Sequence, residues 1–350
     1  MSLHISKKNN SKSIFDKEIY VNFAKYILSC QDSEGGIHWE PNSKLDPWDH
    51  IESAMGLDVM GFEAESKKAY YWLRTNQERD GSWPSIFYST EENNLKETNF
   101  SSYIAVGMWH HFTNFNDKDF LYEFWPVLDA AIEFTLAAQT EHGDFFWAKD
   151  DKNWLDDSLK TGCSSIYMSL FCYKKIAKEI NKQDRVSDAQ LNNLKECLRS
   201  KSFRFDRNWE SKQRYSMDWY YPVLCGIYND TKGIERIRTK WKTFIVGGKG
   251  CKCVEEEPWV TVAESSELVL TLVKLNLLEE AQDLFKSLHQ WKDKSDGLYW
   301  TGYVYTDEKF WPIEKPTWTA GAVILAADSL FKFSPGNVLF STDWSEVNSN

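Results

Sequence analysis

Features that would send the chain to a membrane or out of the cell are missing from the sequence. No stretch reaches the roughly 18 apolar residues that a membrane-spanning helix needs. The N-terminal Met1–Lys17 is polar and rich in Lys, Ser and Asn, without the apolar core of a signal peptide. We therefore expect a soluble, cytoplasmic protein that does not span a membrane.

A basic surplus is also missing. The chain has 41 Lys and Arg against 52 Asp and Glu, a formal net charge of -11. Nucleic acid and anionic lipid both require a basic face on the protein, so neither is expected as a partner. Gly-rich phosphate loops, Rossmann fingerprints, nucleophile elbows and zinc-protease motifs are absent as well, so we expect no cofactor.

The cysteines do not form a recognisable disulfide or metal-binding pattern. Their number, seven, is odd, and five of them fall inside helical apolar patterns, where a thiol acts as a small hydrophobe. Cys251 and Cys253 lie in a turn-rich stretch without a nearby His or second Cys pair, so we expect free thiols and no metal site.

Aromatic residues, by contrast, are abundant. The 17 Trp, 16 Tyr and 21 Phe make up 15% of the chain, which is more ring surface than a core of this size normally requires. Some of these rings are therefore expected to face a ligand.

Apolar residues recur at helical spacing along the whole chain, which predicts an all-α protein. Two kinds of helix alternate. One kind is amphipathic, as at Phe23, Phe124, Trp241 and Phe285, and the other is apolar or small on nearly every side, as at 166–176 and 320–330. A helix that is apolar all round must be buried all round.

Six buried helices are predicted, which begin near Trp48, Asn99, Gly162, Met217, Thr261 and Trp318. Their separation is that of a helical hairpin with its loops. Six inner helices, each paired with an outer one, close into a double ring, an (α/α)6 toroid. We expect one toroid domain over residues 16–332, with polar extensions at 1–15 and 333–350.

A second repeat accompanies the hairpins. After an outer helix the chain repeatedly runs through a Gln-acid-Gly-aromatic turn, at Gln31–Trp39, Gln77–Trp83, Gln139–Trp147 and, more loosely, Gln290–Trp300. Glycine supplies the left-handed residue that ends a helix, and the ring after it packs back across the turn.

The loops before the six inner helices are dense in acids and rings, and in a ring of hairpins they emerge at the same end. This geometry predicts one concave site. Two opposed carboxyls, one protonated and one ionised, are what cleavage of a glycosidic bond needs. Other carboxylates in these loops include Asp46, Glu52 and Glu267. The candidate catalytic residues are Asp49, Glu97, Asp218 and Glu264.

Sugars have apolar faces that stack on rings and hydroxyls that accept and donate hydrogen bonds. The candidate substrate-binding residues are Trp48, His50, Asn99, Tyr103, Tyr167, Trp219, Tyr220, Trp259 and Trp318. His110 and His111 lie within an apolar helix and are interpreted as buried structural residues.

The segment 98–151 resembles hairpins of the six-hairpin glycosidase superfamily, which includes glucoamylase-like enzymes. There an inner helix is followed by an acidic loop, an outer helix with a Trp-Pro pair followed by an Ala, and a Gly turn, and Trp125, Pro126, Ala130 and Gly143 match these positions. The resemblance implies the toroid fold and a carbohydrate-active enzyme, but it assigns no catalytic Glu.

The Gln-to-Trp turns also resemble the repeat of the terpenoid cyclases and protein prenyltransferases. The Asp-x-Asp-Asp proton donor of those cyclases is absent, because the nearest run, Asp156-Asp157 after Asn153, lacks the first Asp. The sequence also has no Asp-x-Cys with a downstream His that could hold a catalytic zinc.

Three functions stay open from the sequence. The leading hypothesis is an inverting glycoside hydrolase for a small glycoside, with Glu97 or Asp49 as the acid and Asp218 or Glu264 as the base. The second is an enzyme acting on an isoprenoid, whose carbocations the rings would stabilise. The third is a ring that binds a sugar or a peptide and catalyses no reaction.

Overall fold

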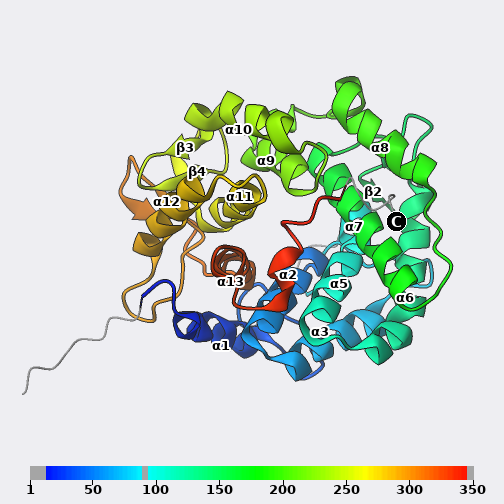
Figure 1. The fold of residues 1–350 in the computed structure, drawn as a ribbon, viewed down its shortest axis with the longest axis horizontal. Coiled ribbons are helices and arrows are strands. Elements are labelled where there is room, and N and C mark those ends of the chain that lie inside the picture. The colour runs from blue at the N-terminus through cyan, green and yellow to red at the C-terminus, as the bar shows by residue number, and fades with distance from the viewer. Residues whose placement is uncertain (1–12, 89–93, 345–350) are drawn as a thin grey trace, which may run out of the picture.

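The computed structural model describes residues 13–88 and 94–344 and forms a double ring of helices (Figure 1). Within these residues the inner ring consists of α2 (Pro47–Met60), α4 (Thr98–Ser102) continued by α5 (Ile104–Phe115), α7 (Lys160–Glu179), α9 (Ser216–Leu224), α11 (Val262–Lys274) and α13 (Thr317–Phe331). All six predicted inner helices are confirmed. None of the described helices is long and apolar enough to cross a membrane.

The outer ring consists of α1 (Val21–Cys30), α3 (Glu63–Asn76), α6 (Lys118–Ala137), α8 (Asp188–Ser200), α10 (Asp230–Phe244) and α12 (Leu278–Leu288). Each presents one apolar face to the inner ring and one polar face to solvent, whereas nearly every residue of α2 and α13 is buried. The alternation of buried and amphipathic helices in the sequence therefore produces the predicted (α/α)6 toroid.

Helices α2 and α13 close the ring, because the first and last inner helices pack side by side (Figure 1). Glycine allows this close approach. A Cβ on Gly56 would lie 3.1 Å from Gly321 Cα, and one on Gly321 would lie 3.0 Å from the Glu52 carbonyl oxygen. The two ends of the domain are thereby held in direct contact.

The Gln-acid-Gly-aromatic turns join neighbouring outer helices. The Gln77 side-chain amide donates to the Gly81 carbonyl of its own turn at 3.0 Å and to the Val127 carbonyl of α6 at 2.8 Å. Gly81 has φ +89, and a Cβ there would lie 2.2 Å from the Ala130 carbonyl oxygen, so only glycine lets the turn lie against α6. Equivalent contacts recur at Gln31 with Gly35 and at Gln139 with Gly143.

A small antiparallel sheet, which the sequence analysis does not predict, lies beside α11. Its order is β3 (Ile245–Val246), β4 (Gly250–Lys252), β5 (Trp259–Thr261), β6 (Gly302–Val304) and β7 (Lys309–Phe310). Strand β5 runs directly into α11, so the sheet fixes where that inner helix begins. A second pair, β1 (Lys96–Glu97) with β2 (Ala148–Lys149), does the same for α4.

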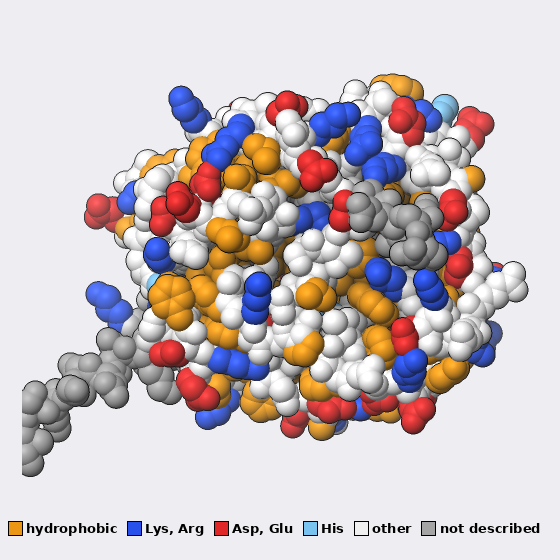
Figure 2. Space-filling view, in the orientation of Figure 1, with side chains coloured by type: hydrophobic (Ala, Val, Ile, Leu, Met, Phe, Trp, Pro, Cys, Tyr) orange, Lys and Arg blue, Asp and Glu red, His pale blue; other side chains and the backbone are white. Residues whose placement is uncertain are grey.

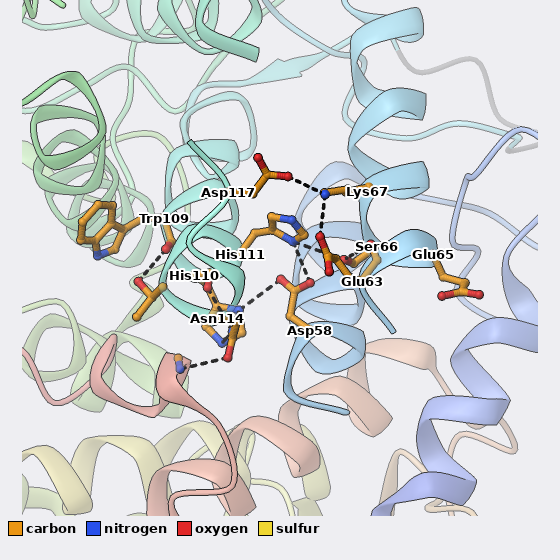
Figure 3. Close-up of polar contacts among 12 residues, drawn as sticks. Asp58, Glu63, Glu65, Ser66, Lys67, Trp109, His110, His111, Asn114 and Asp117 are labelled. Atoms are coloured by element: carbon orange, nitrogen blue, oxygen red, sulfur yellow. Dashed lines mark hydrogen bonds and ion pairs between the residues drawn. The ribbon is translucent and has the colours of Figure 1, made fainter. Parts of the chain in front are cut away.

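A buried ionic cluster holds together the ends of α2, α3 and α5 that lie away from these strands (Figure 3). The Asp58 carboxylate lies 2.9 Å from His111 Nδ1 and 3.4 Å from His110 Nδ1, and all three side chains are buried. Burial acts to raise the pKa of Asp58, but the two imidazoles outweigh it and hold that pKa below its ordinary value. His110 and His111 are thus structural, as predicted.

The inner helices finish at one end of the ring, which is called the closed end below. The C-terminal segment crosses the centre of the ring at this end (Figure 1). The sequence analysis treats 333–350 as a polar extension, but Leu339, Phe340 and Trp344 are buried in the ring. Lys274 at the end of α11 donates from Nζ to the Thr342 carbonyl at 2.5 Å. Residues 345–350, like 1–12 at the other terminus, lie outside the described residues.

Acidic and basic side chains of the described residues are interspersed across the face seen in Figure 2. Among these residues, the face does not show the gathered acids that the sequence predicts for the site. Those acids belong to the opposite, open end, where the inner helices begin.

Candidate active site

Two hollows lie next to each other at the open end of the ring, where the inner helices begin. They share Leu159, Thr161 and Met217 in their linings, so they adjoin each other, and together they are called the cleft below. The Asp49 hollow, of about 250 Å³, is lined by Asp46, Trp48, Asp49, Glu97, Asn99, Phe100, Leu159, Thr161, Gly162, Met217 and Trp318. The Asp218 hollow, of about 270 Å³, is lined by Leu159, Lys160, Thr161, Lys212, Tyr215, Met217, Asp218 and Cys253.

Asp46 and Asp49 form a carboxyl pair at the start of α2. Asp46 is the N-cap residue, and its carboxylate accepts from the Asp49 backbone N–H at 2.9 Å, with Pro47 at the first helical position. Burial raises the pKa of Asp49 well above its ordinary value, and the neighbouring Asp46 charge raises it further. Like charges this close do not both ionise readily, so the protonated form of Asp49 is favoured.

Glu97 presents a second protonated carboxyl to the Asp49 hollow. It lies on β1, where its Cα pairs with that of Ala148, and it immediately precedes α4. Burial raises the pKa of Glu97 to about 8, with a further contribution from the charge of Asp46. A carboxylic acid with this pKa donates a proton near neutral pH.

Asp218 lies in the first turn of α9 and is only 5% exposed. Its Oδ2 is 3.7 Å from Nζ of Lys160, the first residue of α7. Burial raises the pKa of Asp218, and the positive charges of Lys160 and Arg236 oppose that shift. Lys160 thus favours the ionised form of the one acid in the Asp218 hollow.

Glu264 occupies the first turn of α11 and is 8% exposed. It does not line either hollow directly. It forms a side-chain hydrogen bond with Cys253, which lines the Asp218 hollow, and burial followed by the charge of Glu264 raises the pKa of that thiol. One side chain therefore separates Glu264 from the cleft.

Two further acids, Glu52 and Glu267, lie one helical turn below Asp49 and Glu264. Glu52 accepts from the Tyr103 hydroxyl at 2.7 Å and from Trp318 Nε1 at 2.7 Å. Burial raises the pKa of Glu52 to about 7, although these hydrogen bonds oppose it. Burial, then the charge of Glu52, raises the pKa of Glu267 well above its ordinary value.

The sequence analysis names Glu52 and Glu267 as loop carboxylates but not as site residues. The sequence pattern that could have identified them is their position three residues after a selected acid, Asp49 or Glu264. Two residues three apart in a helix lie on the same helix face. Lys160 and Cys253 are also absent from the predicted site, since neither type is expected in a carboxylate pair.

Three predicted binding residues, Trp48, Asn99 and Trp318, line the Asp49 hollow. Trp48 stacks on Tyr103, with ring centroids 4.4 Å apart and planes 6° apart, and this contact holds the indole at the cleft. Trp219 lies in a smaller recess beside Asp218, where its Nε1 donates to the Arg236 carbonyl at 2.8 Å. Trp259 lines a separate hollow on the sheet.

The other four predicted binding residues are buried and line neither hollow. His50 Nδ1 accepts from the Ile37 backbone N–H and Nε2 donates to the Ala69 carbonyl, both at 3.0 Å, and burial lowers the pKa of His50 to about 4. Tyr103 and Tyr220 hydrogen-bond the buried acids Glu52 and Glu267. Tyr167 packs on Phe171.

Comparisons with solved structures support the fold. A structure described as a wild-type glycosidase superposes with a TM-score of 0.68 at 12% identity, covering 91% of this chain and 99% of that chain. A D-mannose isomerase gives 0.68 at 10% identity, covering 92% and 99%. An alpha-amylase from Clostridium perfringens gives 0.60 at 12% identity, covering 88% and 97%. The likeness to terpenoid cyclases gains no support from these neighbours.

The sequence comparison is more specific. No protein-family model matches the chain. The MMP endo-(1,4)-3-O-methyl-alpha-D-mannosidase of Mycolicibacterium hassiacum is 39% identical over 318 residues, which cover 91% of this chain and 87% of that protein. Because this similarity spans nearly the whole ring, the chain belongs to the family of that mannosidase and is a glycoside hydrolase-like protein.

Proposed function

We propose that this protein hydrolyses α-(1,4) glycosidic bonds inside an oligosaccharide of O-methylated mannose units. The observation that carries the proposal is the lining of the Asp49 hollow, where two acids of raised pKa, Asp49 and Glu97, lie with the indoles of Trp48 and Trp318. The mannosidase of the same family, whose name specifies this linkage and sugar, supplies the substrate class. This substrate is longer than the small glycoside expected from the sequence.

The reaction is an inversion in one step. Asp49 or Glu97 gives its proton to the glycosidic oxygen as the bond from that oxygen to the anomeric carbon breaks. A water molecule attacks the anomeric carbon from the other side of the sugar and gives a proton to Asp218 or Glu264. One carboxyl loses a proton and another gains one, so the enzyme needs no metal or cofactor for this step.

The division of roles follows from the charges around each acid. The pKa of Glu97 is raised to about 8 and that of Asp49 is raised well above its ordinary value, and both shifts favour the protonated form that a general acid requires. Burial raises the pKa of Asp218 as well, but Lys160 beside it opposes that shift and so favours the carboxylate that a base requires. Glu264 is the alternative base, because Cys253 connects it to the same hollow.

The cleft also suits a methylated sugar. Trp48 and Trp318 offer faces for stacking, and Asn99 offers an amide for hydroxyl groups. Leu159 and Met217, shared by both hollows, form an apolar surface. An O-methyl group that packs on this surface buries its own apolar area, which favours binding. The four polar side chains Asp46, Asp49, Glu97 and Asn99 disfavour an isoprenoid, which would need a lining of rings with a lone acid.

The test is turnover of α-(1,4)-linked 3-O-methylmannose oligosaccharides by the protein and by Asp218→Asn and Glu264→Gln. We expect at least one substitution to lower kcat by more than about tenfold, because removal of a general base typically costs more than this. Glu133→Gln is the control, since its side chain is 65% exposed on the outer helix α6. If neither substitution reaches tenfold, the base is another group.

A further inference from the structure

A third hollow, of about 560 Å³, lies on the outward face of the sheet beside the cleft. This sheet hollow is formed by Trp259, Val304 and Lys309 on the strands, by Trp311, and by a facing wall that includes Arg214 and Val254. It is larger than either hollow of the cleft, and its volume falls within the roughly 300 to 1,000 Å³ typical of ligand sites.

One face of the sheet builds its floor. Trp259 pairs with Val304 and Val304 with Lys309 across β5, β6 and β7, and directly paired residues have side chains on the same face. The opposite face is used for packing, where Tyr303 stacks on Trp291 with centroids 4.1 Å apart. The outward face is therefore free of the ring's core.

Two indoles dominate this outward face. Trp311 is 52% exposed, and its ring lies 5.0 Å from that of Trp259 at 73°. Trp259 Nε1 donates to the Trp311 carbonyl at 2.7 Å, which fixes the two residues relative to each other. The outer face of a sheet is ordinarily polar, so a held pair of indoles, the exposed Trp311 against the half-buried Trp259, is typical of a binding surface.

The sheet hollow and the cleft share a wall. Tyr215 and Val254 form an antiparallel bridge between the two hollows. Tyr215 and Cys253 line the Asp218 hollow, while their chain neighbours Arg214 and Val254 line the sheet hollow. The segments that carry these residues therefore contribute to both hollows, so the two lie next to each other.

The charges of the sheet hollow are balanced. Arg214 and Lys309 face Glu257 and Asp307 in its lining, and Lys309 forms an ion pair with Asp307 at 2.7 Å. A balanced set exerts no net attraction on an ion but offers donors and acceptors for hydroxyl groups. Together with the indoles, it matches a neutral ligand with apolar faces and polar edges, which describes a sugar.

We propose that the sheet hollow is a distal subsite that binds sugar units of the same oligosaccharide, beyond the bond being cleaved. The inference rests on the proposed function, because it takes the substrate to be a chain that runs through the cleft. It assigns Trp259 to this subsite rather than to the catalytic cleft, and it makes Trp311 the residue on which the affinity for long chains depends.

The test compares α-(1,4)-linked 3-O-methylmannose oligosaccharides of increasing length. For the unaltered protein we expect kcat/KM to rise with length, and for Trp311→Ala we expect the ratio of kcat/KM for the longest to the shortest to fall about tenfold. Trp311→Phe, which keeps a ring, should restore most of that ratio. Tyr122→Ala is the control, because Tyr122 is a similarly exposed ring, at 46%, on the outer helix α6.

Titration calorimetry with the same oligosaccharides separates the two proposals. If the unaltered protein binds long chains more tightly than short ones but cleaves none, the distal subsite stands and the proposed hydrolysis fails. If cleavage occurs and neither affinity nor kcat/KM depends on length, the distal subsite is overturned. It is also overturned if sedimentation reveals a dimer that Trp311→Ala dissociates, since a second copy would then cover the indoles.

Discussion

Individual carboxyls at the open end differ in how deeply they lie. In the first turn of α2, Asp49 faces the cleft and Glu52 lies three residues later beneath it, and Glu264 and Glu267 repeat this spacing on α11. The deeper acids contact Tyr103 and Tyr220 rather than the cleft. Asp49 is therefore available to a substrate, whereas Cys253 lies between Glu264 and the cleft, and the lower acids set the charge beneath both.

The proposed general acid is Asp49 or Glu97, and the pH dependence of activity tests Glu97. With Glu97 as the donor, kcat/KM should fall as the pH rises through about 8, because the carboxyl then loses the proton that the leaving group needs. Glu97→Gln should lower kcat by about a hundredfold or more on an oligosaccharide. It should leave the hydrolysis of a glycosyl fluoride, whose leaving group needs no proton, much less affected.

Asp49→Asn is the matched comparison in the same assay. If that variant alone loses oligosaccharide turnover and keeps turnover of the fluoride, the acid is Asp49. If both variants cleave oligosaccharides at the unaltered rate, proton donation from the Asp49 hollow is excluded.

The protonation state of the Glu52 carboxyl affects the free energy of unfolding. Its folded pKa of about 7 is raised above the ordinary value of 4.5, so its contribution to stability is complete below about pH 4.5 and is lost as the pH rises through 7. Going from pH 4 to pH 8, the unfolding free energy of Glu52→Gln should improve relative to the unaltered protein by on the order of 3 kcal/mol. Urea unfolding at the two pH values measures this, and a difference that does not change with pH would contradict the burial argument.

Sequence reasoning selects three acids that line the cleft, Asp49, Glu97 and Asp218, because each lies in or directly before the first turn of an inner helix. It is less successful with their neighbours. A helix rotates by about 100° per residue, so His50 points away from the cleft although it adjoins Asp49. The sequence names which loop reaches the site, but the rotation within each turn decides which side chain does.

At the scale of elements, the Gln-acid-Gly-aromatic turns fasten one outer helix to the next. Gly81→Ala tests this contact, because the new Cβ would meet the Ala130 carbonyl oxygen of α6 at 2.2 Å. Gly61→Ala is a close control, since Gly61 has a similar φ of +84 but no atom within 4 Å of the Cβ position.

Both variants bear the cost of a left-handed alanine, about 1 kcal/mol or more. Gly81→Ala should lose at least about 2 kcal/mol beyond Gly61→Ala, because backbone must also move. Chemical denaturation of both variants measures the difference. Equal losses would mean that the turns do not hold α3 against α6.

The elements differ in how far the sequence predicts them. Inner helices such as α13 are apolar on every side over fifteen residues, and that pattern is unmistakable. The sheet is not predicted, because strands of two or three residues such as β5 and β7 carry no measurable period. Outer helices α3 and α8 are not singled out in the sequence analysis, although α8 has apolar residues at helical spacing, Leu191, Leu194 and Leu198.

At the scale of the whole molecule, the two ends of the ring have different roles. At the closed end the C-terminal segment packs on the ring through a few large apolar residues, Phe340 and Trp344 among them. Because the rest of this segment is polar, its composition predicts an extension rather than a packed segment. The open end gathers the beginnings of the inner helices, as their order in the sequence implies, and forms the cleft.

The stereochemistry of cleavage tests the central claim, that carboxyls at the open end hydrolyse a glycosidic bond with a water molecule as the nucleophile. The measurement is proton magnetic resonance of the new reducing end during the first minutes of reaction on an α-(1,4)-linked 3-O-methylmannose oligosaccharide. The account predicts internal cleavage with the β-anomer formed first, followed by slow equilibration. Formation of the α-anomer first, or no cleavage at all, would contradict it.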